Sequence, residues 1–369
     1  MIQSRMIPTP GTPVNDLDTP ALLLDLDIFE ANIERMSGFF REKTCRLRPH
    51  AKTHKCPQVA LRQISAGACG ITCAKVSEAE VFARAGVQDI LIANQVTGQP
   101  KVNRLAALAG EVNLMVAIDR EANLNEISQA CKLAGTSLRI LVEVDLGMQR
   151  CGVEPGQPVL NLARKICSFS NLTFSGIQAY EGHLVFIKDP EERAEKVKQA
   201  FIPLVETAAL LEKHGLPASI VSGGGTGTYD LTGVLPPYNE VQAGSYVFMD
   251  STNYQIRPEF RPSLSVLSTI LSRPVPGRLI IDAGMKALTH EFGLPTPIDL
   301  PNAKLTRLSE EHGRIEMGDD DMPHLRPGEK IRILPSHCCT TTNLYDVLYV
   351  IRDERLVDIW EIAARGCNQ

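Results

Sequence analysis

The sequence of 369 residues predicts an α/β protein, with a (β/α)8 barrel of the TIM type followed by a smaller, mainly β C-terminal domain. Two observations predict this fold. Short apolar runs alternate with helical patterns from about residue 21 onward, and strand-like segments between Gly, Pro and Asp turns replace them after about residue 255. Repeated strand-then-helix units indicate parallel strands joined by crossover helices. Eight or nine units over about 230 residues fit a closed barrel better than the alternative, an open doubly wound sheet.

Nine apolar runs in the first part are typical of buried parallel strands. Between them lie helical patterns such as VSEAEVFARAG, in which we expect Ser77 to cap the helix, with Glu80 three residues later, and Gly86 to end it. We expect this barrel to occupy residues 20–255. The expected strands are ALLLDLD (21–27), RLRPHAK (46–52), GITCAK (70–75), DILIAN (89–94), NLMVAID (113–119), RILVEVD (139–145), FSGIQAY (174–180), ASIVSGG (218–224) and EVQAGSY (240–246).

The last third of the chain largely lacks helical periods and predicts a β domain. We expect this domain to span residues 256–369, joined by the N-terminal segment 1–19, and to carry a metal site. Three consecutive aspartates, Asp319 to Asp321, are expected to form a solvated turn. The strand-like segments are SLSVLSTILSR, RLIIDAG, GRIEMG, EKIRILP and DVLYVIRDERLVDIWEI.

Composition excludes several classes of function. Hydrophobic residues make up 44% and charged residues 22% of the chain, as in ordinary globular proteins. The net charge of −5 argues against general affinity for nucleic acid or anionic membranes. We find no signal peptide and no apolar run near the roughly 18 residues that would span a membrane. The ten scattered cysteines then suggest reduced thiols and a cytoplasmic protein.

The stretch RLRPHAKTHK places Arg46, Arg48, His50 and Lys52 at every second position of an expected strand. Because side chains alternate across a strand, these four would share one face. Lys52 would lie at the C-terminal end of the strand, where barrels of this type carry their active sites. A lysine whose pKa is lowered by cationic neighbours can form a Schiff base. A solvated lysine at a strand end is the alternative.

A glycine-rich loop follows another expected strand, in IVSGGGTGTYD (220–230). Its four glycines, at 223, 224, 225 and 227, leave backbone N–H groups accessible to a phosphate. The segment AGSY could complete such a cradle with Ser245 and Tyr246. A plain flexible turn would have the same composition.

Two more strand ends carry candidate groups. In EVDLGMQRCGV, Asp145 and Arg150 flank a turn at Gly147, and the guanidinium could hold a phenolate or carboxylate. In QAYEGH, Tyr180 ends a strand and His183 could act as a base near neutral pH. A structural Asp–Arg pair and a structural histidine are the alternatives.

The segment PSHCCTTTNLYD carries His337 and Cys339 two residues apart. On a strand they would share a face and could ligate a soft divalent metal, zinc above all. Two ligands are too few for a closed structural site, so a catalytic site with open positions is the more plausible metal site. A buried His and Cys in a core would also explain the pattern.

Taken together, these motifs resemble the fold-type III, alanine racemase-like pyridoxal phosphate enzymes, and most closely the D-threonine aldolase and D-serine dehydratase family. The resemblance covers nearly the full chain in order. It rests on TPALLLDLD (19–27), RPHAKTHK, EVDLGMQRCGV, GGGTGTYD, GSYVFMD, DAGMKA (282–287) and HCCTTTNLYD.

This resemblance implies that Lys52 forms the Schiff base with pyridoxal 5'-phosphate, with Lys55 as the second candidate. It also implies that Arg150 faces the phenolic oxygen of the cofactor, that His337 and Cys339 bind zinc, or manganese or magnesium, and that the chain forms a homodimer. The expected cofactor-binding residues are His50, Lys52, Arg150, Tyr180, Ser222, Gly224, Gly225, Thr226, Gly244, Ser245 and Tyr246.

Both reactions of this family start from a 3-hydroxy-D-amino acid. The pairing of His with Cys favours a dehydratase, which gives a 2-oxo acid and ammonia. His183 favours the alternative, aldolase cleavage to glycine and an aldehyde. A racemase without a metal and a non-catalytic cofactor carrier are further alternatives, and the carrier is disfavoured because a barrel alone has no use for the C-terminal domain.

Overall fold

The computed structural model describes residues 8–318 and 325–369, so Asp319 to Asp321 lie outside the described residues. The chain divides into two compact units. The β unit contains Met1–Glu34, Thr53–Cys56 and Ser245–Arg365, and the barrel unit contains Arg35–Lys52, Pro57–Gly244 and Gly366–Gln369. The domain boundaries predicted near residues 20 and 255 stay a prediction; these units begin and end elsewhere.

The barrel unit is built on eight parallel strands in the order β2-β9-β8-β7-β6-β5-β4-β3. The ring is closed between its first and last strands by a parallel bridge between His50 and Thr72 and by the Thr72 N–H, which donates to the Pro49 carbonyl at 2.9 Å. The strands are β2 (Arg46–Leu47), β3 (Ile71–Cys73), β4 (Asp89–Ile92), β5 (Asn113–Ile118), β6 (Leu138–Val144), β7 (Leu172–Ala179), β8 (Ile220–Gly223) and β9 (Glu240–Val241).

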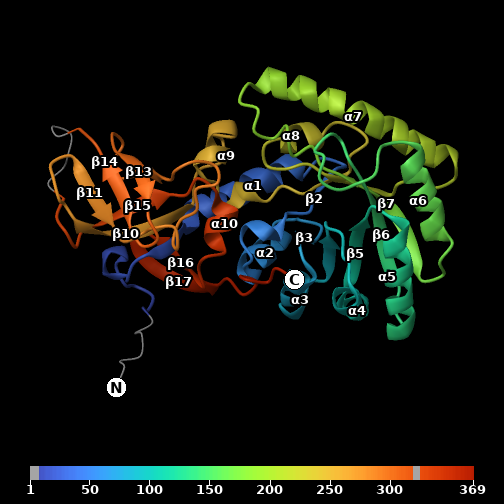
Figure 1. Cartoon of the computed structure of the whole chain (residues 1–369), viewed down its shortest axis with the longest axis horizontal. Coiled ribbons are helices and arrows are strands. Elements are labelled where there is room, and N and C mark those ends of the chain that lie inside the picture. The colour runs from blue at the N-terminus through green and yellow to red at the C-terminus, as the bar shows by residue number, and fades with distance from the viewer. Residues whose placement is uncertain (1–7, 319–324) are drawn as a thin grey trace. The chain divides into compact units, whose positions relative to one another are not determined.

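Helices follow these strands and surround them, which confirms the predicted (β/α)8 architecture (Figure 1). Their buried faces are apolar, as in α6, where Val159, Leu162 and Ile166 recur at helical spacing. The helices of this unit are α2 (Pro57–Ser65), α3 (Val76–Arg84), α4 (Gln99–Leu108), α5 (Glu121–Ala134), α6 (Gln157–Cys167), α7 (Pro190–Lys213) and α8 (Tyr229–Thr232).

The β unit contains a nine-stranded mixed sheet, as predicted for the C-terminal part. Its path runs β13-β14-β11-β10-β1-β16-β17, and β15 pairs with both β10 and β12. The strands are β1 (Ala21–Asp25), β10 (Leu264–Ser272), β11 (Arg278–Ile281), β12 (Thr296–Pro297), β13 (Lys304–Leu308), β14 (Gly313–Glu316), β15 (Lys330–Leu334), β16 (Val347–Arg352) and β17 (Arg355–Glu361).

Strand β1 corrects one prediction, because ALLLDLD was expected in the barrel. It instead pairs antiparallel with β10, Ala21 opposite Leu267, and parallel with β16, Leu23 opposite Tyr349. All four of its first residues are buried. Helix α1 (Leu26–Phe40) then leads from the β unit into the barrel unit, since residues after Glu34 belong to the latter.

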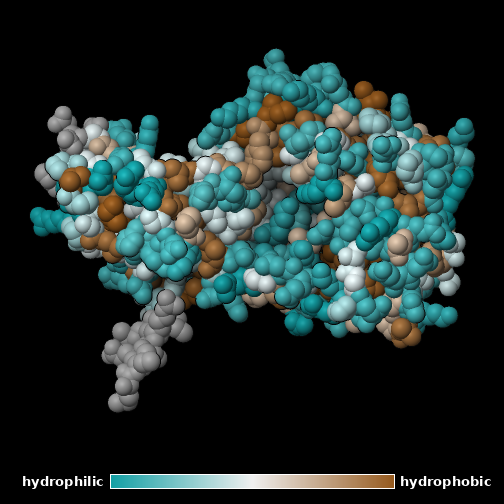
Figure 2. Space-filling view, in the orientation of Figure 1, coloured by the Kyte–Doolittle hydropathy of each residue, from teal (hydrophilic) through white to brown (hydrophobic). Residues whose placement is uncertain are grey.

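The β unit also contains short helices. They are η1 (Val14–Asp16), η3 (Ser245–Val247), α9 (Ser251–Ile256), α10 (Cys338–Thr342) and the last residue of η2 (Ala51–Thr53). The hydrophobic core of the β unit includes Leu17, Leu23, Leu267 and Leu356, all almost fully buried. The surface in Figure 2 is mostly hydrophilic with scattered hydrophobic atoms. Among the described residues, no helix combines the length and apolarity needed to cross a membrane.

Candidate functional site

The C-terminal ends of five barrel strands lie level with one another. The register pairs Val144 of β6 with Ala179 of β7, Ala179 with Gly223 of β8, Gly223 with Val241 of β9, and Val241 with Leu47 of β2. The loops after these strands therefore emerge at one edge of the barrel, which is the edge that carries active sites in this architecture. Most of the candidate cofactor residues predicted from the sequence lie on these loops, whereas Ser222 lies within β8 and Ser245 and Tyr246 lie in η3.

Lys52 lies just beyond β2, in the turn η2, and is exposed. The strand predicted through residue 52 is shorter than expected, because β2 ends at Leu47. His50 is buried, and its Nδ1 accepts a hydrogen bond from the Lys52 backbone N–H at 3.5 Å. The histidine thus fixes the chain next to the lysine.

Arg48 contradicts the prediction of four cationic groups on one face. Its Nε lies 2.8 Å from a carboxylate oxygen of Glu240, and its Nη1 pairs with Asp89. Arg48 is buried, whereas Arg46 is exposed. Two carboxylates neutralise the Arg48 guanidinium, so its charge cannot be assigned to Lys52.

The glycine-rich loop after β8 packs closely on other backbone. A Cβ atom at Gly223 would lie 1.8 Å from the Ala179 carbonyl oxygen, and one at Gly227 would lie 2.2 Å from the Val185 carbonyl oxygen. Gly224 has a φ of +72°, which glycine adopts readily. At Gly225 the nearest atoms to such a Cβ belong to the Tyr180 ring at 3.5 Å, an ordinary contact. Glycine is therefore required by packing at two positions and leaves the loop open at a third.

Glu181 binds the residues that follow this loop, and the sequence analysis did not identify it as a site residue. It is fully buried, and its Oε1 accepts hydrogen bonds from Thr228 at 2.6 Å and Thr232 at 3.0 Å. Burial raises the pKa of its carboxyl group. No sequence pattern marks this role, because Glu181 is an isolated carboxylate between two candidate residues, Tyr180 and His183.

The other expected cofactor residues fall in three places. Ser222 is buried, and its hydroxyl donates to Glu240 at 2.7 Å and accepts from the Gln242 side chain at 2.9 Å. Thr226 is buried in the glycine-rich loop and Gly244 follows β9. Ser245 and Tyr246 lie in η3 of the β unit, where the Tyr246 ring packs 5.8 Å from that of Phe260, between centroids.

Arg150, Tyr180 and His183 gather after β6 and β7. The Arg150 guanidinium lies over the Tyr180 ring, 5.8 Å from its centroid, and 3.9 Å from Glu143. The His183 ring is exposed and lies 3.6 Å from the Cβ position of Gly147. Asp145 accepts hydrogen bonds from the backbone of the same turn at Gly147 and Gln149, so its role is to shape the turn. The assignment of these residues to a cofactor stays a prediction.

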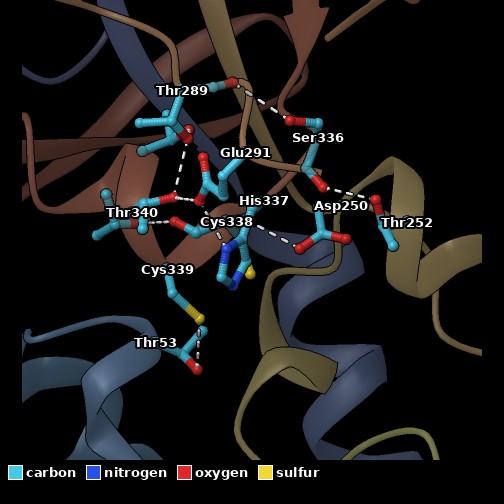
Figure 3. Close-up of polar contacts among 12 residues, drawn as sticks. Thr53, Asp250, Thr252, Thr289, Glu291, Ser336, His337, Cys338, Cys339 and Thr340 are labelled. Carbon is cyan, nitrogen blue, oxygen red and sulfur yellow. Dashed lines mark hydrogen bonds and ion pairs between the residues drawn. The ribbon is translucent and has the colours of Figure 1, made fainter. Parts of the chain in front are cut away.

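In the β unit, His337 and Cys339 are held by a helix start and not by a strand. His337 is the N-cap of α10, and Cys339 lies in the first turn of this helix. The Nδ1 atom of His337 lies 2.8 Å from the Glu291 carboxylate, and Figure 3 draws this contact. The His337 ring packs at a tilt against that of Phe292, with 4.5 Å between the centroids. A carboxylate on Nδ1 is the usual partner of a metal-binding histidine, and it leaves Nε2 for the metal.

The electrostatics of the pair suit a cation. A hydrogen bond with Cys338, and then the hydrogen bond and charge of His337, hold the pKa of the Cys339 thiol well below its ordinary range. Burial lowers the pKa of His337, but Cys339, Asp250 and Glu291 together raise it to about 9. A thiolate beside an imidazolium can exchange the imidazolium proton for a divalent metal.

The neighbours of this pair come from distant parts of the chain. The Cys339 thiol lies 3.4 Å from the hydroxyl of Thr53, the residue that directly follows Lys52 (Figure 3). The Cys338 N–H donates to the buried carboxylate of Asp250 at 2.9 Å. Within the described residues, no group of three or more His, Cys, Asp or Glu side chains could hold a metal. The pair therefore offers a two-ligand site whose remaining positions would go to water or substrate.

Comparison with known proteins identifies the family. The family "Alanine racemase, N-terminal domain" matches residues 24–252, and "Putative serine dehydratase domain" matches residues 263–351. A D-threonine aldolase of an Arthrobacter species is 44% identical over 98% of this chain and 96% of its own length. A D-threo-3-hydroxyaspartate dehydratase of a Delftia species is 30% identical over 94% of this chain and 97% of its own length.

Solved structures agree with this. The crystal structure of D-threonine aldolase from Filomicrobium marinum has a TM-score of 0.95 and 39% identity, and the match covers 98% of this chain and 100% of that one. One structure of a D-threo-3-hydroxyaspartate dehydratase is a cysteine-to-alanine mutant in the metal-free form. With a matching family over more than half of its length and relatives of this identity along nearly all of it, the chain belongs to the alanine racemase-like, fold-type III pyridoxal phosphate enzymes and is a lyase of that family.

Proposed function

We propose that this protein is a pyridoxal phosphate- and metal-dependent lyase of 3-hydroxy-D-amino acids that cleaves them to glycine and an aldehyde. The 44% identity to a D-threonine aldolase along nearly the whole chain is the observation that carries the choice of reaction. The sequence motifs alone favoured dehydration, but the dehydratase relatives are less similar, at 30% and 24% identity.

The residues of the barrel edge fit the cofactor. The open side of Gly225, with the tightly packed Gly223 and Gly227 on either side, leaves backbone room for a phosphate. Lys52 is exposed in η2, which follows β2, and would bind the aldehyde. Arg150 would meet the phenolic oxygen. When bound, pyridoxal phosphate supplies the electron sink for a bond broken at Cα.

His337 and Cys339 would hold the metal, for which an imidazole and a thiolate favour zinc over manganese or magnesium. The Glu291 carboxylate beside Nδ1 of His337 would orient the ring and leave Nε2 available as the ligand atom. The metal would supply Lewis-acid chemistry at the substrate hydroxyl.

His183 is the base of this proposal. Its ring is exposed at the barrel edge beside the turn at Gly147, so a substrate can reach it. In aldol cleavage it would accept the proton of the substrate hydroxyl at a ring nitrogen, while the Cα–Cβ bond breaks.

Dehydration is the second candidate, because the metal pair contains a thiolate. Within the family that the motifs resemble, a metal pair of His and Cys is typical of the dehydratases. Here Lys52 would take the Cα proton, the hydroxyl would leave with the help of the metal, and His183 would have no proton to accept.

The deciding experiment is product identification. The purified protein, loaded with pyridoxal phosphate and zinc, is incubated with D-threonine, with L-threonine as control, and the products are identified by mass spectrometry. Glycine and acetaldehyde support cleavage, and 2-oxobutanoate with ammonia would replace it with dehydration. L-allo-Threonine alone as product, formed by inversion at Cα only, would indicate a racemase. No product from any 3-hydroxy-D-amino acid would favour a non-catalytic cofactor carrier.

The cytoplasmic location suggested by the cysteines also belongs to this proposal. So does the homodimer, which the family resemblance implies. A mass near twice 40.4 kDa in light scattering would support the dimer, and a mass near 40.4 kDa would contradict it.

A further inference from the structure

The start of helix α9 forms several hydrogen bonds with the segment that carries the expected metal ligands. Asp250, the N-cap of α9, is fully buried, and its Oδ1 accepts from the Asn253 N–H at 2.7 Å. Its other oxygen, Oδ2, accepts from the Cys338 N–H at 2.9 Å, and the Asn253 side-chain amide lies 3.0 Å from both oxygens. One carboxylate thus holds both a helix end and the residue between His337 and Cys339.

The next two residues form further hydrogen bonds with the same segment. The Ser251 N–H donates to the Pro335 carbonyl at 3.0 Å, and the Thr252 hydroxyl donates to the Ser336 carbonyl at 2.9 Å. Figure 3 shows Asp250 and Thr252 beside Ser336, His337 and Cys338. The cap residue of α9 and the first two residues of the helix therefore form hydrogen bonds with three of the four residues from 335 to 338.

We propose that Asp250 is a positioning residue that holds His337 and Cys339 in the arrangement that binds metal. The proposal rests on the proposed function, because it takes these two residues as the ligands. Asp250 acts on the two ligands through the N–H of Cys338, which lies between them in the chain.

The physical reason is preorganisation. An ionised carboxylate is an acceptor only, so it can satisfy the N–H groups of Asn253 and Cys338 at once. Without it, the buried Cys338 N–H would lose its partner, and the segment would relax to other conformations in search of one. The metal would then have to order this segment on binding, which weakens its affinity.

Two substitutions separate this role from plain helix capping. Asp250→Asn keeps an oxygen that can cap α9, since Asn and Asp cap about equally well, but it replaces the acceptor facing Cys338 with an amide donor. Asp250→Ala removes both functions. Asp189→Ala is the matched control, because Asp189 caps α7 with the same kind of bond, to the Glu192 N–H at 2.7 Å, in the barrel unit.

The experiment measures zinc affinity of the full-length protein loaded with pyridoxal phosphate, by competition with a chelating dye. We expect Asp250→Asn and Asp250→Ala to bind zinc about 10–100-fold more weakly than the wild type, the usual cost of losing an outer-shell partner. Asp189→Ala should lower the melting temperature and leave zinc affinity unchanged. Cobalt at saturation should still give its thiolate absorption band in Asp250→Asn, because both ligands remain.

The outcomes distinguish this proposal from the proposed function. Zinc affinity within twofold of wild type in both Asp250 variants overturns the positioning role alone. A wild type that binds no zinc overturns it together with the metal site. Weaker zinc binding in the variants supports it even if the wild type fails to act on D-threonine, because the measurement does not depend on turnover.

Discussion

The barrel unit and the β unit present their functional groups in different ways. In the barrel unit the candidate residues lie on loops that follow five different strands, and the level register of those strands brings the loops to one edge. In the β unit both expected ligands lie within three residues, and distant residues such as Asp250, Glu291 and Thr53 hold them. A site made by a regular scaffold should tolerate loss of one supporting contact better than a site made by one short segment.

The largest expected effect tests the barrel edge at its reactive group. Lys52→Ala should abolish turnover, because the covalent bond that holds the cofactor is lost. The absorbance of the Schiff base should vanish. Lys55→Ala is the matched control, since Lys55 is three residues away and its ammonium lies 3.5 Å from the Ala364 carbonyl in the β unit; loss of the band in that variant instead would exchange the two roles.

Metal removal tests the short segment of the β unit. A chelator should reduce turnover at least tenfold, and added zinc should restore it, because the Lewis acid acts on the substrate hydroxyl. Cys339→Ala should behave like the chelated protein and resist rescue. Cys338→Ala, one position away, should keep its zinc, since the backbone N–H that binds Asp250 remains. Activity that survives complete removal of metal would point to a racemase-type reaction.

The sequence predicted the barrel better than it predicted the surroundings of the site. Six of the eight barrel strands fall within expected runs, and β6 and β7 begin one and two residues before theirs, because apolar runs bounded by helical patterns are a local signal. The run at β1 has the same local signal, and only its pairing with β10 and β16 places it in the β unit. Local chemistry was also misread at α3, where the Glu78 carboxylate accepts from the Lys75 N–H and Ser77 bonds the Gln369 carbonyl.

The site shows the same division. Lys52, the glycine loop and the pair at 337 and 339 carry unusual residue patterns that can be recognised in a single sequence. The residues that hold these groups in place carry no such pattern. Asp250 is 88 residues from Cys338, and Glu291 is 46 residues from His337. A spacing of two residues suggested a strand, but a helix start can also present residues 337 and 339 together. Only tertiary structure reveals such partners.

A moderate effect is expected at the glycine loop. Gly225→Ala should leave the melting temperature unchanged, because its Cβ would meet Tyr180 at 3.5 Å and the Val185 side chain at 3.7 Å, which are ordinary contacts. It should weaken pyridoxal phosphate binding about tenfold if the loop approaches the phosphate closely. Gly38→Ala is the control, because nothing lies within 4 Å of its Cβ position in α1; it should gain about 0.5–1 kcal/mol of stability and keep cofactor affinity. Equal cofactor affinity in both variants would remove the loop from the phosphate site.

The smallest effect is expected at Thr53, and it tests how sensitive the short segment of the β unit is to one contact. Thr53→Val keeps the shape of the side chain and removes the hydroxyl that lies 3.4 Å from the Cys339 thiol. A net hydrogen bond contributes about 0.5–1.5 kcal/mol, so zinc affinity measured by dye competition should fall roughly twofold to tenfold. Thr53→Ser keeps the hydroxyl and should bind zinc as the wild type does. Because Thr53 follows Lys52 directly in the chain, a change in cofactor absorbance in Thr53→Ser alone would mean that packing of the Thr53 methyl group, and not its hydroxyl, supports the lysine. Unchanged zinc affinity in Thr53→Val would show that the contact between Thr53 and Cys339 does not support the ligand segment.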